Sequence, residues 1–168
     1  YYHMDKEIDS NLDEIASYSQ AAYSWLMLIT NYYKRVSDDL DINIDEMMTL
    51  NTVSAHWLYK INSKNNKSFS DLIDMSDEDI KKYFSGSRLS ILSIANILGQ
   101  PKESTRRRVQ KLIDYQLLKK DENNGIMLGE NYTSLVNKFA DKTAAELYKL
   151  TSRLGKINWY KKKEEETL

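Results

Sequence analysis

Apolar residues recur every three or four positions along most of the chain, which predicts a mainly helical protein. The first stripe spans about six turns and predicts one long N-terminal helix. Its members are Ile15, Tyr18, Ala22, Trp25, Leu26, Ile29, Tyr32, Tyr33 and Val36. A second helix is expected behind the cap signature of Asn43 to Glu46. Its apolar residues, from Met47 to Ile61, occupy most sides, as in a central core helix.

The middle of the chain predicts two shorter helices joined by a turn. Ser90 is a good N-cap for the first, and Gly99 stands where a left-handed residue would end it. Pro101 falls at the first position of the second helix, where its missing N–H is not needed. The second helix has one inward stripe, formed by Thr105, Val109, Leu112, Ile113 and Leu117.

Two short strands are expected next, at residues 117–120 and 126–128. They are joined through residues 121–125, where Asn124 and Gly125 are expected to supply the positive backbone angles of a hairpin turn. A short apolar helix, a Gly turn, a basic helix and a tight hairpin together predict a winged helix-turn-helix with a two-stranded wing.

A last helix is expected from a cap at Thr133, and its late spacings approach a coiled-coil seam. Its apolar side carries Leu135, Val136, Phe139, Thr143, Leu147, Leu150, Leu154 and Ile157. The fold class is therefore mainly α, a winged helix-turn-helix flanked by long N- and C-terminal helices. The expected divisions are an expression remnant at 1–4, a helical N-terminal region at 5–86 for dimerisation or effector sensing, a DNA-binding domain at 87–130, a dimerisation helix at 131–160 and a disordered tail at 161–168.

Charge is distributed unevenly along the chain. Between Gly99 and Lys120 seven basic residues face two acidic ones, whereas the rest of the chain has 17 basic and 23 acidic residues. The whole chain carries a formal charge of −1. A basic segment in an acidic body directs a polyanion toward one face. The alternative is a merely solvated helix face, as most charge runs are.

The same segment resembles the DNA-binding part of bacterial winged helix-turn-helix regulators of the MarR and IclR kind. The resemblance covers about a quarter of the chain. It rests on Leu98-Gly99, Pro101-Lys102-Glu103-Ser104, Arg106-Arg107-Arg108-Val109 and Leu117-Leu118. Thr105 stands where the family usually has Val, and Gln116 replaces the Gly that turns the chain into the wing. The resemblance implies that residues 101–116 form a recognition helix that enters the major groove.

The candidate DNA-binding residues lie on this helix and on the wing. Base edges are assigned to Ser104, Arg106, Arg107 and Gln110, because arginine prefers guanine O6 and N7. Phosphate contacts that set the register are assigned to Lys102, Arg108 and Lys111 and to the wing residues Lys119, Lys120, Asn123 and Asn124. Two alternatives stay open: a winged-helix module that binds a protein partner, and a non-specific architectural DNA-binding protein.

The terminal helices have more apolar surface than a small domain needs, which favours a homodimer. In MarR-like proteins the terminal helices form the dimer, so the resemblance extends to architecture. The alternative is that both helices pack together within one monomer. A small-molecule effector pocket is a further hypothesis, lined by Trp25, Tyr32, His56 and Trp57. Ordinary core packing is the competing interpretation of these residues.

The sequence offers little chemistry for an enzyme. It contains no Cys, so disulfides and Cys-based metal sites or nucleophiles are excluded. His56 has no catalytic partner in the pattern, and there is neither a Gly-rich phosphate loop nor paired His spacing for zinc. We expect no catalytic activity, no cofactor and no metal. With no apolar run of membrane-spanning length, we expect a cytoplasmic protein that does not bind membranes.

Overall fold

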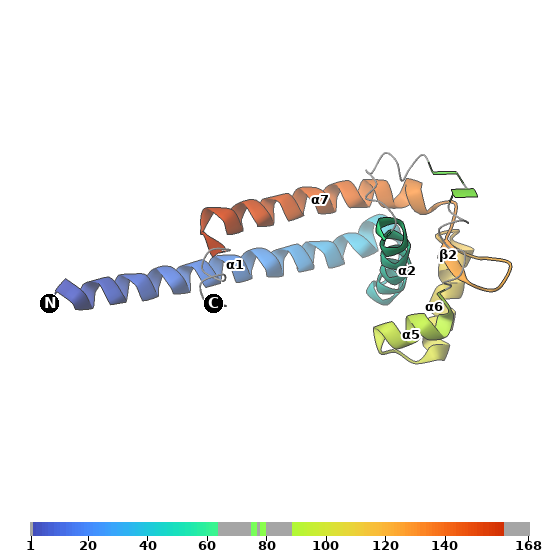
Figure 1. Ribbon diagram of the computed structural model, residues 1–168, viewed down its shortest axis with the longest axis horizontal. Coiled ribbons are helices and arrows are strands. Elements are labelled where there is room, and N and C mark those ends of the chain that lie inside the picture. The colour runs from blue at the N-terminus through green and yellow to red at the C-terminus, as the bar shows by residue number, and fades with distance from the viewer. Residues whose placement is uncertain (1, 64–74, 77, 80–88, 160–168) are drawn as a thin grey trace. The chain divides into compact units, whose positions relative to one another are not determined.

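The computed structural model describes residues 2–63, 75–76, 78–79 and 89–159 (Figure 1). The chain divides into two compact units. The helix-pair unit comprises residues 1–39 and 138–168, and the hairpin unit comprises residues 40–137. The elements in chain order are α1 (Tyr2–Leu40), α2 (Ile44–Asn62), α5 (Ile91–Leu98), α6 (Lys102–Asp114), β1 (Leu118–Lys120), β2 (Ile126–Leu128) and α7 (Tyr132–Lys156). The predicted mainly α class with a two-stranded hairpin is confirmed, and the predicted tail at 161–168 lies outside the described residues.

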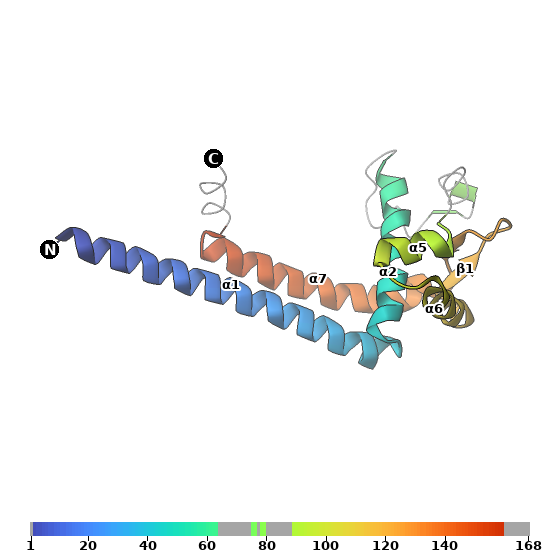
Figure 2. The same ribbon diagram turned by 90° about the horizontal axis from the view of Figure 1, so that it is seen from below.

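In the helix-pair unit, α1 and α7 lie side by side and antiparallel (Figures 1 and 2). The ring of Tyr32 meets Phe139 edge-on, with centroids 5.2 Å apart. Arg35 forms a 2.6 Å ion pair with Glu146. Residues far apart in sequence thus hold the two helices together within one chain. This packing is the alternative that the sequence left open beside a dimer formed by the terminal helices.

One face of α1 nevertheless stays exposed. The helix is continuous, as predicted, but its apolar stripe divides: Tyr32 turns toward α7, while other members face solvent. Their exposed fractions are Tyr18 66%, Trp25 52%, Leu26 61%, Ile29 44% and Tyr33 59%. Spacings of three and four residues place these side chains on one side of the helix. The stripe is therefore wider than one neighbouring helix covers.

In the hairpin unit, α2 begins at the predicted capping box. The side chain of Asn43 accepts a hydrogen bond from the N–H of Glu46, and Glu46 Oε2 accepts one from the N–H of Asn43, both at 2.9 Å. The side of α2 that carries Leu50 and Val53 is buried against neighbours that include α5, α6 and β2. The expectation that α2 is apolar and enclosed on most sides is wrong, because its opposite side, with Tyr59, is exposed.

The short helix α5 begins and ends as predicted. Ser90 Oγ accepts a hydrogen bond from the N–H of Ser93 at 3.0 Å, and Gly99 adopts φ 61°. Pro101 is one position earlier than predicted: with ψ 135° it is the N-cap of α6 and not its first helical residue. Its extended ψ lets the chain leave the turn before α6 begins at Lys102.

The hairpin has the two predicted strands, although β1 begins at Leu118, one residue later than predicted, and Lys119 pairs with Met127 at its centre. Its turn differs from the prediction, because Asn124 has φ 60° and Gly125 has no positive φ. Asp121 organises the turn instead: its Oδ1 accepts hydrogen bonds from the N–H groups of Asn123 at 2.8 Å and Gly125 at 2.7 Å. These bonds replace the left-handed pair expected from an Asn-Gly sequence.

The chain turns from α6 into β1 at Gln116, which adopts φ 58° although it is not Gly. The N–H of Leu117 reaches back to the carbonyl of Leu112 at 2.9 Å, as in a Schellman motif. The backbone carbonyl of Gln116 accepts a hydrogen bond from the N–H of Asn131 at 3.0 Å. The family's usual Gly is thus absent, but the geometry that it would allow is present.

Replacing Gln116 by Gly is expected to raise the free energy of unfolding by about 0.5 kcal/mol. Relief of left-handed strain contributes about 1 kcal/mol, and loss of the exposed hydrogen bond from Asn131 Nδ2 to Gln116 Oε1 removes about half of that. Urea unfolding followed by circular dichroism measures the difference. A lower midpoint in the variant would show that the side-chain bond outweighs the strain.

The last helix, α7, begins one residue before the predicted cap. It starts at Tyr132, whose N–H donates to the carbonyl of Gly129 at 3.3 Å. Thr133 is exposed and lies within the first turn, so it is not the N-cap. The preceding turn around Gly129 fixes the start of the helix.

Candidate nucleic-acid interface

Helix α6 is anchored along one side and exposed along the other. Thr105, Val109 and Leu112 are at most 1% exposed and fix the inward face, as predicted. The opposite face carries the exposed side chains of Lys102, Arg106, Arg107 and Gln110, with Ser104 half-buried beside them. The short helix α5 packs against α6. A rigid scaffold therefore presents a polar and basic helix face to solvent.

Arg106 is held along the helix by Glu103. Two hydrogen bonds join them, from Nε at 2.9 Å and from Nη2 at 2.7 Å. The Arg106 side chain lowers the pKa of Glu103, and Glu103 raises the pKa of Arg106, in each case chiefly through this hydrogen bonding. The Glu103 carboxylate thus offsets part of the positive charge of Arg106. The same hydrogen bonds orient the planar guanidinium near the N-terminal end of the helix.

Lys102 and Arg107 differ from Arg106 in this respect. In the part of the chain that the structure describes, neither forms a side-chain hydrogen bond or an ion pair, and both are exposed. Gln110 Nε2 donates to Asp114 Oδ1 at 2.9 Å, an exposed bond that an incoming acceptor can replace. On this helix face, Lys102 and Arg107 are therefore the basic residues whose side chains stay free of a hydrogen bond or ion pair within the described residues, although the charge of Arg107 also contributes to lowering the pKa of Glu103.

Arg108 and Lys111 lie on the side of α6 that faces α2. Arg108 Nη2 lies 2.6 Å from Asp45 Oδ2, and Lys111 Nζ lies 2.9 Å from Glu46 Oε2. The hydrogen bond to Glu46 raises the pKa of Lys111. Sequence analysis missed these acidic partners, because no local pattern links residues separated by 63 and 65 positions. The predicted phosphate contacts of Arg108 and Lys111 stay predictions, now with a competing role.

The wing presents its predicted residues at the surface. Lys120, Asn123 and Asn124 are exposed, and Lys119 is half-buried. On the other side of the hairpin, the N–H of Ile126 donates to the carbonyl of Leu89 at 2.9 Å, which ties the wing to the segment before α5. Residues 89–128 thus contain α5, a turn, α6 and a pair of antiparallel strands, in that order. Residues 89–128 form a winged helix-turn-helix.

No family model matches the sequence, and no curated protein matches it. Among solved structures, the fold is similar to the crystal structure of a MarR/EmrR family transcriptional regulator from Acinetobacter sp. ADP1. The two chains are 15% identical, with a TM-score of 0.45 over 98% of this chain and 96% of that chain. The winged-helix assignment rests on the geometry of residues 89–128.

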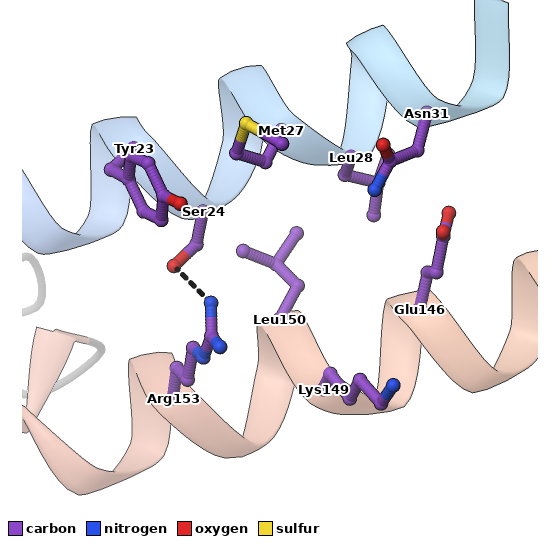
Figure 3. A pocket seen from close by; sticks show the side chains of 9 residues that line it. All are labelled: Tyr23, Ser24, Met27, Leu28, Asn31, Glu146, Lys149, Leu150 and Arg153. Carbon is purple, nitrogen blue, oxygen red and sulfur yellow. Dashed lines mark hydrogen bonds between the residues drawn. The ribbon is translucent and has the colours of Figure 1, made fainter. Parts of the chain in front are cut away.

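The predicted effector residues belong to different units. Trp25 and Tyr32 lie in the helix-pair unit, whereas His56 and Trp57 lie in the hairpin unit. In the helix-pair unit, α1 and α7 line an open pocket of about 250 Å³ (Figure 3). It is lined by Tyr23, Ser24, Met27, Leu28, Asn31, Glu146, Lys149, Leu150 and Arg153. An effector pocket formed by the four predicted residues stays a prediction.

His56 lines a separate shallow groove between α2 and α5. Its other walls are formed by residues that include Met48, Tyr59 and Ile97. Across the described ranges, no cluster of His, Cys, Asp and Glu is arranged to hold a metal ion. None of the described helices is both long and apolar enough to cross a membrane.

Proposed function

We propose that the protein is a sequence-specific DNA-binding transcription regulator whose α6 enters the major groove. The observation that carries this proposal is the exposed face of α6, whose inward side is fixed by buried residues. A helix can enter the groove only if such a face is free and its base is rigid. Lys102 and Arg107 supply positive charge there, and neither forms an ion pair within the described residues.

The division of roles follows from side-chain chemistry. Arg107 and Gln110 suit base edges, since arginine pairs with guanine and glutamine with adenine in bidentate geometry. Arg106 is assigned to a base edge or phosphate through the end of its guanidinium. Lys102 and the wing residue Lys120 suit phosphates, because the lysine ammonium is a compact point charge.

Selection of bound duplexes from a random pool, followed by sequencing, tests this function. Enrichment of one sequence at near-physiological salt supports a regulator that reads bases. Binding without enrichment would favour a non-specific architectural protein. No binding would favour a module that docks on a protein partner, and would overturn the proposal.

We also propose that the regulator acts as a homodimer through the exposed stripe of α1. The side chains of Trp25, Leu26, Ile29 and Tyr33 form a continuous apolar face. Monomeric proteins rarely expose large contiguous apolar patches. A two-fold dimer places two recognition helices on one side of the duplex, so the selected sequence is expected to be a palindrome.

Leu26→Glu is expected to shift the protein from dimer to monomer. Leu26 is 61% exposed, so the change leaves the core of one chain intact but introduces two buried charges into a symmetric interface. Size-exclusion chromatography with light scattering at micromolar concentration measures the mass. Lys34→Glu, at an exposed polar position of the same helix, is the control. An unchanged mass for Leu26→Glu would exclude this face as the dimer interface.

A further inference from the structure

We propose that Asp45 is a positioning residue for the recognition helix, and that Arg108 is its partner and not a phosphate ligand. The inference deepens the proposed DNA-binding function and rests on it. Asp45 lies in the first turn of α2, and Arg108 lies in the middle of α6. Their contact joins two helices whose relative placement determines how α6 meets a duplex.

The contact includes the turn between α5 and α6 as a third element. Asp45 Oδ2 accepts a hydrogen bond from Arg108 Nη2 at 2.6 Å, and Asp45 Oδ1 accepts one from Gln100 Nε2 at 3.4 Å. Gln100 Oε1 in turn accepts a hydrogen bond from Arg108 Nη1. Three side chains from α2, the turn and α6 therefore close a ring of hydrogen bonds. Such a ring fixes both the position and the rotation of α6.

The acidic end of the ring is held in place by the capping box. Glu46, next to Asp45, is 5% exposed, caps α2 through Asn43 and also binds Lys111 Nζ at 2.9 Å. The first turn of α2 thus presents two carboxylates to α6 from a preorganised backbone. The two basic residues are met on successive turns of α6, three positions apart.

The charge of Arg108 is consequently less available to DNA than the charge of Arg107. The Arg108 side chain is 22% exposed and is directed to a carboxylate, whereas Arg107 is exposed and has no ion pair within the described residues. A phosphate at Arg108 would compete with the Asp45 carboxylate, which already neutralises the charge of this guanidinium. We therefore expect Lys102, which is assigned to a phosphate and is exposed, and not Arg108, to count among the residues that release counterions on binding.

The salt dependence of DNA binding distinguishes the two roles. Fluorescence anisotropy with the selected duplex gives the slope of log K against log salt concentration for wild type, Lys102→Gln and Arg108→Gln. Lys102→Gln, at the residue assigned to a phosphate, is expected to reduce the magnitude of the slope by about 0.9. Arg108→Gln is expected to leave the slope unchanged but to lower the preference for the selected over a random duplex about tenfold. A slope reduced by about 0.9 in Arg108→Gln would overturn the proposal.

A double-mutant cycle measured by thermal unfolding without DNA tests the coupling between Asp45 and Arg108 separately from the DNA-binding function. Asp45→Asn and Arg108→Gln are each expected to lower the melting temperature by about 3 °C, and the double variant by no more than the larger single loss. Asp38→Asn, which removes the same charge at an exposed position of α1, is the control, and its melting temperature is expected to stay close to that of the wild type. Additive losses would overturn the positioning role even if the protein binds DNA. Non-additive losses in a protein that binds no duplex would retain the ring and reject only the DNA-binding proposal.

Discussion

Arg107→Glu is expected to lower the affinity for the selected duplex about 100-fold or more. The change removes a positive charge that has no ion pair within the described residues and places a carboxylate against the phosphates or base edges of the major groove. Arg107 is exposed, so the fold is expected to be retained. Fluorescence anisotropy near physiological salt measures the dissociation constant, and circular dichroism checks the fold.

Two companion variants sharpen this experiment. Lys34→Glu makes the same change in net charge on α1 and is expected to alter affinity less than threefold, because it leaves the residues of the proposed interface unchanged. Arg106→Glu is expected to abolish binding as well, since it also places two carboxylates, its own and that of Glu103, at the N-terminal end of α6. Equal affinities of Arg107→Glu and wild type would show that the exposed face of α6 does not contact DNA.

Gly129→Ala is expected to lower the free energy of unfolding by about 3 kcal/mol. A Cβ at this position would overlap the carbonyl oxygen of Gln116 and lie 2.7 Å from its carbonyl carbon and 2.9 Å from the carbonyl carbon of Leu117. Backbone atoms cannot move aside as a flexible side chain does, so the turn from α6 into β1 must shift. The substitution also strains the hydrogen bond from the Gly129 N–H to the Leu117 carbonyl, which measures 2.8 Å.

Gly99→Ala provides the matched control for this prediction. Gly99 has φ 61°, but a Cβ there would meet no atom within 4 Å. Only left-handed strain remains, and we expect a loss of about 1 kcal/mol. Urea unfolding of both variants measures the two losses. A loss at Gly129 no larger than that at Gly99 would contradict the role assigned to close packing at Gln116.

The structure changes how the charge of the basic segment is understood. Arg106 binds Glu103, Arg108 binds Asp45 and Lys111 binds Glu46, so three of the helix's basic residues already have carboxylate partners. The excess of basic residues between Gly99 and Lys120 therefore overstates the charge available to a ligand. Fewer basic side chains of α6 are therefore available to a nucleic acid, and Arg107 is expected to contribute a larger share of the binding.

Local patterns predicted the elements because their causes are local. Asn43 with Glu46 predicted the start of α2, Ser90 predicted that of α5, and Gly99 its end, since each contact lies within a few residues. The strands on either side of residues 121–125 were predicted for the same reason. The errors at Pro101, Gly125 and Thr133 lie at element boundaries, where neighbouring hydrogen bonds shift a turn by one residue.

The sequence by itself determined the order of helices and strands, the inward stripe of α6 and the presence of a basic helix. These follow from periodicity and capping, which act over one or two turns. Only the tertiary structure decided that Arg108 and Lys111 have acidic partners on α2 and which part of the α1 stripe is covered by α7. Ion pairs such as Asp45 with Arg108 join positions 63 residues apart. Their formation depends on how packed helices bring side chains together, a relation that no short-range pattern contains.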